Sequence, residues 1–347
     1  MIAGAGVAGI EALIALHALA GDRVNTTVVS PDPHFSLQAD SVEEPFARPP
    51  ARRCSVADVC AAYGATYVPA ALTAVDADAR RVTTDDGGEL AFDSLLVAVG
   101  ARRERVLEGH AVVFAGDRDA EAMHGLVQDI ELGYAKRIAF VVPAGVSWPL
   151  PLYELALMTA ERAREMCQDD VKLLVVTPEE LPLGVLGRVA SGAVQAALHK
   201  ADIEMLTASN VRGVIGGSIF VDPSGVMIPV DRVVAVPRLT GPRVPGLPAD
   251  EHGFIQVDPY CRVQGTRGLF AAGDGTTCPI KQGGLAAQQA AVAALGIAQR
   301  AGVAVAAHPF DPALHVELLT RTHRVAAPHL SAYLAALEPR AVLEGAI

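Results

Sequence analysis

Short apolar runs, glycine turns and alanine-rich stretches alternate along the chain. Residues 1–20 have the pattern of a strand end, a glycine turn and an Ala/Leu-rich helix, and the apolar run 24–29 is typical of a buried parallel strand. Together they predict a βαβ unit. Over residues 65–100 the pattern changes to short segments between Asp-rich turns, which predicts a meander that closes with a buried strand at 94–99.

A second unit of the same kind follows in the middle of the chain. Apolar runs at 137–142 and 171–177 flank a helical pattern at 152–166, and a further strand is predicted at 231–236. The proline-rich stretch 237–253 is incompatible with a helix, which indicates a connector between domains.

The last third of the chain returns to the first pattern, with a short apolar strand at 268–272 and an Ala-rich helix at 282–300. Strand, glycine turn and helix therefore occur twice. This order predicts an α/β fold of two Rossmann-like, three-layer dinucleotide-binding domains, the second inserted into the first. The expected boundaries are 1–105 with 237–310 for the first domain, 106–236 for the second, and a short C-terminal segment at 311–347.

Composition restricts the classes of function. The 347 residues are 51% hydrophobic and 19% charged, and a net charge of −11 repels nucleic acid, so we expect no nucleic-acid partner. Mean hydropathy is +0.32. Every apolar stretch is nevertheless interrupted before the roughly 20 residues that a membrane-spanning helix needs, so no transmembrane segment is expected.

Cysteine, histidine and the N-terminal pattern add to these limits. The five cysteines form no CxxC pair, the histidines show no metal spacing, and no signal-peptide pattern opens the chain. We therefore expect a cytoplasmic protein without a metal site. Only three residues precede the first glycine, Gly4, which leaves little room for a leading strand. Together with the short C-terminal segment, this indicates that the natural chain is longer and that a segment is missing between His323 and Arg324.

A Gly-x-Gly-x-x-Gly motif at Gly4, Gly6 and Gly9 opens the first helix. Its glycines allow a tight turn, close approach of a pyrophosphate, and close helix packing, and the helix N-terminus then binds the phosphate. A chance match in an Ala/Gly-rich helix start is the alternative. Asp32, after the second strand, is placed to accept hydrogen bonds from an adenosine ribose; a solvated turn residue is the alternative.

A second carboxylate motif lies near the end of the chain. The strand at 268–272 delivers Asp274 at its carboxyl end, where ligands bind in open α/β sheets. An Asp there can accept hydrogen bonds from the ribityl hydroxyls of a flavin; a simple turn at the end of the strand is the alternative. The following segment Gln282, Gly283 and Gly284 begins the long helix, whose positive end would point at the flavin ring.

These motifs, with the strand that closes as Leu-Leu-Val-Ala-Val-Gly-Ala at 95–101, resemble the FAD-dependent pyridine nucleotide-disulfide oxidoreductase superfamily over about residues 1–310. Segments 143–154 and 279–284 resemble the branch of sulfide:quinone reductases, flavocytochrome c sulfide dehydrogenases and type II NADH dehydrogenases. The resemblance implies FAD as the prosthetic group. It implies contacts from all three glycines of the first motif, the backbone at 73–75, Gly100, Asp274 and the helix start at 281–285.

The second domain departs from the relatives that use NADH. Its glycine turn holds only Gly145, followed by a proline-rich insertion before Glu154, so backbone cannot approach a second pyrophosphate in the usual way. We expect a degenerate nucleotide site there, which makes NAD(P)H a doubtful substrate. The sulfide-oxidising relatives place a redox cysteine before this Tyr-Glu pair, whereas here Trp148 lies six residues before Glu154.

Three residues are candidates for catalysis, each with an alternative. A cation at Lys281 would stabilise negative charge on a reduced flavin, or it is an exposed loop lysine. Cys278 lies before a helix start whose positive dipole would lower its pKa, although no partner thiol is identifiable. Trp148 would wall a substrate pocket or fill the core between the domains.

Other candidates are weaker. If Cys54 and Cys60 belonged to one helix, they would lie on different faces of it and could not form a redox pair. We therefore interpret them as buried apolar residues. The pair Glu43-Glu44 fits a solvated loop, although the resemblance puts it near the site.

The sequence predicts an FAD-dependent oxidoreductase that passes electrons between a small-molecule donor and an acceptor, quinone-like or other, through the isoalloxazine. An NAD(P)H-dependent flavin reductase or dehydrogenase is one alternative. A non-catalytic flavin-binding or partner-binding paralogue is another alternative, because the absence of a cysteine relay is compatible with an enzyme and with a non-catalytic protein. A homo-oligomer is compatible with the sequence.

Overall fold

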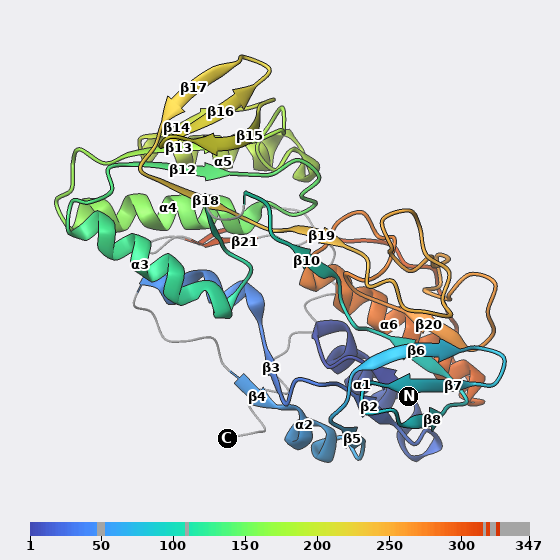
Figure 1. The fold of residues 1–347 in the computed structure, drawn as a ribbon. Helices are drawn as coiled ribbons and strands as arrows, with labels where there is room; N and C mark the ends of the chain where they lie inside the picture. The colour runs from blue at the N-terminus through green and yellow to red at the C-terminus, as the bar shows by residue number, and fades with distance from the viewer. Residues whose placement is uncertain (47–52, 108–110, 315–316, 320–323, 327–347) are drawn as a thin grey trace.

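The computed structural model describes residues 1–46, 53–107, 111–314, 317–319 and 324–326, and two parallel sheets dominate it (Figure 1). The first sheet has the strand order β20-β9-β1-β2-β5, with every neighbouring pair parallel. Its strands are, in that order, β20 (Leu269–Ala271), β9 (Leu95–Val97), β1 (Ile2–Ala3), β2 (Thr27–Val29) and β5 (Thr66–Val68).

Alternate residues of these strands point to opposite layers. Ile2, Leu96 and Phe270 pack in one core with helices α1 (Val7–Ala20) and α6 (Gly283–Arg300), whereas Leu95 and Leu269 pack in a second core on the other face. That second core is covered by the meander β6 (Leu72–Asp76), β7 (Arg81–Thr84) and β8 (Glu89–Ala91). Strands buried on both faces explain why the chain is so apolar.

The second sheet repeats this arrangement with the order β11-β18-β12-β13-β14, again parallel throughout. Its elements are β11 (Val112–Val113), α3 (Ala120–Glu131), β12 (Arg137–Val141), α4 (Leu150–Glu165), β13 (Lys172–Val176), α5 (Arg188–Lys200), β14 (Ile203–Leu206), the meander β15 (Asn210–Ile215), β16 (Ser218–Asp222) and β17 (Val226–Pro229), and β18 (Arg232–Ala235). The predicted fold class, two Rossmann-like domains with the second inserted into the first, is confirmed.

The two domains correspond strand by strand. The units β1-α1-β2 and β12-α4-β13 occupy the centre of their sheets, and a three-stranded meander precedes β9 in one domain and β18 in the other. The carboxyl ends of β2 and β13 are therefore equivalent positions. This equivalence allows the two nucleotide sites of the fold to be compared residue by residue.

Two connections join the domains. Strand β10 (Arg102–Glu104) pairs antiparallel with β19 (Arg238–Thr240), and both chain crossings run through this ribbon (Figure 1). The stretch 237–253 is therefore not a free connector: beyond β19, the Pro245 carbonyl accepts the Val75 amide at 2.9 Å, which attaches it to the first meander.

The second connection is an excursion of the first domain. Strands β3 (His34–Ser36) and β4 (Arg53–Ser55) form a hairpin-like pair, and between them the 3₁₀ segment η2 (Gln38–Phe46) packs against α3 and α4 of the second domain (Figure 1). A hydrogen bond of 2.8 Å joins His124 Nδ1 of α3 and the Pro45 carbonyl. The excursion closes one side of the space between the domains.

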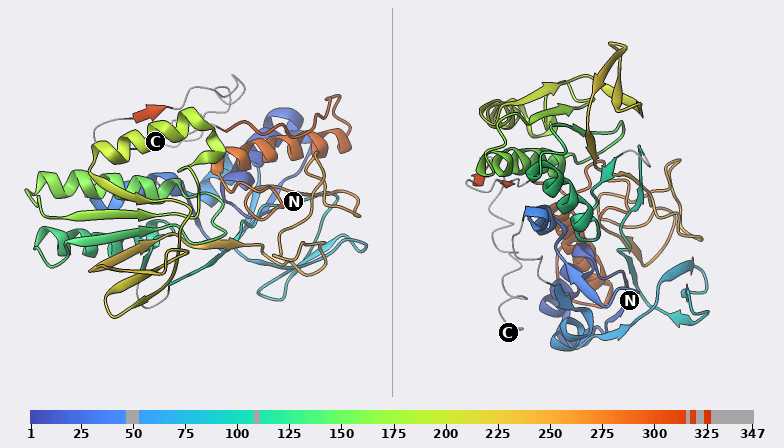
Figure 2. Two further views of the ribbon diagram at one scale, coloured as in Figure 1. Left: turned by 90° about the horizontal axis from the view of Figure 1, so that it is seen from above. Right: turned by 60° about the vertical axis from the view of Figure 1, so that its left-hand side comes forward.

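Shorter elements complete the chain: 3₁₀ segments η1 (Gly21–Arg23), η3 (Asp117–Asp119) and η4 (Gly184–Leu186), helix α2 (Val56–Ala62), and the strand pair β21 (Glu317–Leu319) and β22 (Arg324–Ala326), of which β21 lies against α4 (Figure 2). The segment η1 ends at Arg23, directly before the predicted strand 24–29, and the observed strand β2 begins only at Thr27. Much of the expected C-terminal segment, including His323, lies outside the described residues.

Candidate functional site

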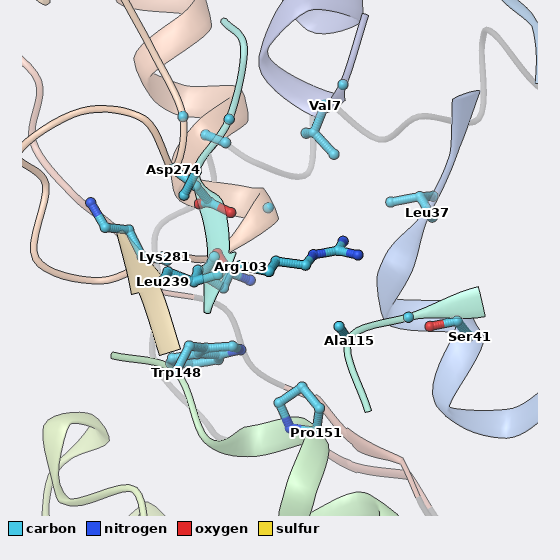
Figure 3. A pocket seen from close by; sticks show the side chains of 18 of the residues that line it. Val7, Leu37, Ser41, Arg103, Ala115, Trp148, Pro151, Leu239, Asp274 and Lys281 are labelled. Atoms are coloured by element: carbon cyan, nitrogen blue, oxygen red, sulfur yellow. The ribbon is translucent and has the colours of Figure 1, made fainter. Parts of the chain in front are cut away.

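A cleft of about 1000 Å³ lies between the two domains and is lined by both. The first domain contributes the loops at the carboxyl ends of its central strands, and the second contributes the end of β11 and the start of α4 (Figure 3). This is the edge at which open α/β sheets bind ligands. The volume is at the upper end for small-molecule sites and suits a dinucleotide.

The three glycines of the first motif have different surroundings. Gly4 has φ +107, and a Cβ there would lie 2.2 Å from the Ala98 carbonyl oxygen; at Gly9 it would lie 1.9 Å from the Gly4 oxygen. These two allow the strand, turn and helix to pack together. Gly6 lines the cleft, and a Cβ there would meet no atom within 4 Å.

Helix α1 presents its N-terminus to the cleft. Gly6 is its N-cap residue, no side chain caps it, and its first turn carries no acidic residue. Val7 and Ala8 line the cleft, so their amides are available to an anion.

Asp32 follows β2 and lines the cleft. Its Oδ1 accepts the His34 amide at 3.1 Å, and its Oδ2 lies 3.6 Å from the guanidinium of Arg118 in the second domain. The side chain is 54% exposed. Asp32 is thus a turn residue, as the alternative expected, but one that faces the cleft.

Asp274 projects its carboxylate into the cleft at the end of β20 (Figure 3). Burial raises its pKa, while Lys281 and Arg103 act in the opposite direction. The turn before it is fixed by a 2.8 Å hydrogen bond from the Gly273 amide to Gln289 Oε1. Within the part of the chain that the structure describes, the Asp274 carboxylate accepts no hydrogen bond, so it is available to a ligand.

The start of α6 lies beside Asp274. Gln282 is the N-cap and its side chain accepts the Leu285 amide at 3.0 Å, while Gly283 and Gly284 line the cleft with free helix amides. Gly100, with φ +71, lines it as well. Seven of the predicted cofactor-binding residues therefore line one cleft, namely Gly6, Asp32, Gly100, Asp274, Gln282, Gly283 and Gly284, whereas Gly4 and Gly9 do not.

Lys281 is buried, so its interpretation as an exposed loop lysine is wrong. Its Nζ donates to the Thr276 carbonyl at 2.5 Å and lies 3.8 Å from the centre of the Phe254 ring. Burial lowers its pKa to about 8, opposed by the charge of Asp274. The aliphatic stem lines the cleft, but the ammonium points away from its interior (Figure 3).

Cys278 does not line the cleft, and its Sγ contacts the Ile280 carbonyl at 3.6 Å. Burial raises the pKa of this thiol, so the expected lowering by a helix dipole is wrong; desolvation dominates. Trp148 lines the cleft and also packs against the core of the second domain (Figure 3).

Three expectations for the first domain need correction. Cys60 lies on α2 and is buried, but Cys54 lies on β4 and is half-buried. The two therefore share no helix, and the interpretation as a buried residue is correct only for Cys60. The backbone at 73–75 pairs within the meander and with residue 245 instead of lining the cleft. Glu43 is half-buried and lines the cleft, because η2 packs on the second domain, so the solvated-loop interpretation is wrong for it.

Two cleft residues were not identified from the sequence as contributors. Arg103 extends its guanidinium into the cleft from β10 (Figure 3). Glu154, a buried carboxylate on α4, lines the cleft near Trp148. The period-two alternation of a strand within the charged run 102–105 is the signal that separates Arg103 from its neighbours.

The equivalent site of the second domain is occupied by its own side chains. Glu179 follows β13, at the position that matches Asp32, and Oε2 of its carboxylate accepts the Tyr153 hydroxyl at 2.5 Å and the Thr177 hydroxyl at 3.0 Å. Its Oε1 accepts the Leu183 amide at 2.9 Å. These bonds leave little capacity for a nucleotide ribose.

The described residues were compared with the requirements of a metal site and of a membrane-spanning helix. In its described ranges no three His, Cys, Asp or Glu side chains are grouped as metal ligands. Among the helices of those same ranges, none has the length and apolarity to cross a membrane.

Known proteins with a similar sequence or fold indicate the family of this chain. An NADH dehydrogenase-like protein of Mycobacterium tuberculosis is 30% identical over 294 residues, which cover 79% of this chain and 72% of that protein. The sulfide:quinone oxidoreductase of Aquifex aeolicus superposes with a TM-score of 0.84 at 18% identity, over 91% of this chain and 80% of its own. A NAD-dependent persulfide reductase of A. fulgidus gives 0.70 at 18% identity, over 97% and 65%.

The two solved structures share the fold with this chain. The family profile described as pyridine nucleotide-disulphide oxidoreductase matches residues 1–294, most of the chain, in agreement with the resemblance seen in its motifs. The chain therefore belongs to the pyridine nucleotide-disulphide oxidoreductase family of flavin-dependent oxidoreductases.

Proposed function

We propose that this protein holds FAD in the interdomain cleft and passes electrons through it between a small-molecule donor and an acceptor. The observation that carries the proposal is the convergence of the uncapped α1 N-terminus, the α6 N-terminus and the Asp274 carboxylate on one cleft. In this proposal residues 1–105 and 237–310 form the flavin domain, and 106–236 form the second domain.

The residues present fit FAD. Open space at Gly6 lets a diphosphate reach the α1 amides, which a larger side chain would block. Asp32 and Asp274 offer carboxylate acceptors for ribose and ribityl hydroxyls. The raised pKa of Asp274 reflects a buried group without a hydrogen-bond donor, and a ribityl hydroxyl would supply one.

When bound, FAD would supply the transfer of electrons or hydride, and the protein supplies binding, orientation and electrostatics. Lys281 places a positive charge in the wall of the cleft, which stabilises negative charge nearby. Trp148 and Pro151 form the wall contributed by the second domain, where a small substrate would pack against apolar surface.

The donor is proposed to be a small molecule other than NAD(P)H. The Glu179 carboxylate is engaged by protein groups, and the turn before α4 has a single glycine, Gly145. A quinone-like acceptor is supported by the likeness to the sulfide:quinone oxidoreductase fold. NADH oxidation remains the second candidate because the related mycobacterial protein carries an NADH dehydrogenase-like name.

Two measurements test the proposal. The visible spectrum of the purified protein should show a stoichiometric flavin band, and acid-released cofactor should chromatograph as FAD. Anaerobic titration with sulfide, a reduced quinone, NADH and NADPH then identifies the donor. Absence of flavin would contradict the cofactor assignment. Bound flavin that none of these donors bleaches would favour the non-catalytic paralogue.

A further inference from the structure

Arg103 stands apart from its neighbours on the interdomain ribbon. In β10 it pairs with Leu239 of β19, and both side chains line the cleft. The flanking residues Arg102 and Glu104 alternate to the other face, where Glu104 forms a 2.8 Å ion pair with Arg238. The ribbon therefore directs one arginine, and only its central one, into the cleft.

Arg103 has no ion pair among the described residues, whereas three other arginines of this region each lie close to an acid. Arg53 pairs with Asp117 at 2.9 Å, Arg105 pairs with Asp119 at 2.5 Å, and Arg118 lies 3.6 Å from Asp32. No hydrogen bond or ion pair of Arg103 occurs among the described residues. Of the acids that act on its charge, Asp119 and Asp117 are engaged by these other arginines, and Asp274 acts on it without forming an ion pair.

The environment of Arg103 favours an anionic ligand. The side chain is solvent-exposed within the cleft, yet enclosure by the cleft walls lowers the pKa of the guanidinium, with Asp119 acting in the opposite direction. A charge that is partly desolvated and unpaired is unfavourable until a counter-charge binds.

The guanidinium projects into the middle of the cleft, on the opposite side from Lys281's ammonium (Figure 3). Val7, the first residue of α1, lines the same cleft. A helix N-terminus carries only about half a positive charge, whereas a diphosphate carries about two negative charges, so α1 alone leaves most of the ligand's charge uncompensated. A guanidinium presents a planar set of donors that suits phosphate oxygens.

We propose that Arg103 binds the diphosphate of FAD from the side of the cleft opposite the α1 N-terminus. The ligand class is a diphosphate, and Arg103 is a binding residue for it in addition to the glycine turn. This inference rests on the proposed function, because it takes FAD as the occupant of the cleft.

The test compares Arg103→Met with Arg102→Met, a matched control on the same strand. Affinities for FAD, ADP and riboflavin are measured by fluorescence and calorimetry on flavin-stripped protein, because ADP has the diphosphate without the flavin and riboflavin the reverse. Arg103→Met should weaken FAD and ADP binding by about tenfold to a hundredfold, the usual effect of a charge-assisted hydrogen bond, and riboflavin binding by less than twofold. Arg102→Met should change none of the three.

Further outcomes decide against the proposal. If Arg103→Met loses as much affinity for riboflavin as for ADP, the substitution has damaged the cleft as a whole. In that case Arg103→Lys, which keeps the positive charge, should bind ADP as weakly as Arg103→Met does. A changed flavin midpoint potential with unchanged FAD and ADP affinities would place the guanidinium at the isoalloxazine and overturn the inference. If wild-type protein binds FAD while Arg103→Met binds it equally well, this inference alone fails. A wild-type protein that binds no FAD overturns the proposed function as well.

Discussion

The Tyr153 hydroxyl donates a 2.5 Å hydrogen bond to the Glu179 carboxylate, and this pair fills the position of the second domain that Asp32 occupies in the first. In a nucleotide-binding unit an acidic residue here accepts the hydroxyls of the ribose. Here it accepts protein donors instead. The same fold thus carries one open and one internally occupied site.

The first prediction concerns nicotinamide cofactors. The Glu179 carboxylate is engaged by protein donors, so the second domain should bind NADH and NADPH only weakly. The rate of flavin reduction should therefore still rise with NADH or NADPH concentration in the millimolar range, without reaching a plateau. Stopped-flow reduction under anaerobic conditions measures this, with sulfide or a reduced quinone as the comparison donor. Saturable reduction by micromolar NADH would contradict the prediction.

The same pair predicts a loss of stability. Tyr153 is fully buried, so Tyr153→Phe leaves a carboxylate with one donor fewer and should lower the free energy of unfolding by about 1.5–3 kcal/mol. Tyr134→Phe is the control, because Tyr134 is 72% exposed, and it should change stability by less than about 0.5 kcal/mol. Urea denaturation of both variants gives the values. Equal stability of the two would show that the hydrogen bond is unimportant.

The glycine turn predicts a separation of folding from binding. Gly6→Ala should fold normally, because its Cβ meets no protein atom and its φ of −76 suits alanine, yet it should weaken FAD binding at least tenfold. Gly4→Ala should instead destabilise the protein, since its Cβ would lie 2.2 Å from the Ala98 oxygen at φ +107. Thermal unfolding and flavin content distinguish them. A Gly6→Ala protein with full FAD affinity would argue against a diphosphate at this turn.

Lys281 predicts a pH-dependent flavin potential. Its ammonium favours the reduced, more negative flavin, so Lys281→Met should lower the midpoint potential, by roughly 20 mV for each kcal/mol of lost interaction in a two-electron couple. Because the pKa of Lys281 is about 8, the difference from wild type should be full below that pH and narrow above it, as the ammonium loses its proton. Spectroelectrochemistry from pH 6 to 10 measures both.

Lys200→Met serves as the control for this series, because Lys200 is exposed on α5. Its potential should follow wild type at every pH. A Lys281→Met potential that equals wild type at pH 7 would remove Lys281 from the electrostatics of the site.

The cysteines predict a flavin-centred reaction without a thiol relay. Cys278 does not line the cleft and burial raises its pKa, so Cys278→Ala should keep donor-dependent flavin reduction within twofold of wild type. Thiol titration should modify exposed Cys167 first. Cys261, whose pKa burial raises to about 12, should react only after unfolding. A large loss of reduction in Cys278→Ala, with flavin retained, would restore a redox role for this thiol.

Sequence patterns identified the features that depend on neighbouring residues. Strands buried on both faces read as continuous apolar runs, and Gly4 and Asp274 lie at turns whose chemistry is local. The location of these motifs on one cleft followed from the general rule for parallel sheets. The direction of the Lys281 ammonium did not, because it depends on Phe254, which is distant in the sequence.

The features that escaped sequence reasoning depend on distant pairing. Arg103 faces the cleft because β10 pairs with β19, and the neighbouring contact from Glu104 to Arg238 spans 134 residues. Glu43 faces it because η2 packs on the second domain. A charged run and a loop of mixed polarity carry no local sign of such partners.

The place of β20 in the first sheet constrains the order of events during biosynthesis. Every strand of the second sheet lies between Val112 and Ala235, so that domain can be completed while the ribosome is still making the rest. Ser94 and Arg300, which contact each other, are 206 residues apart, or roughly 10–40 s of translation. The flavin domain is thus begun first and finished last, and the nascent chain can capture its cofactor only after α6 has emerged.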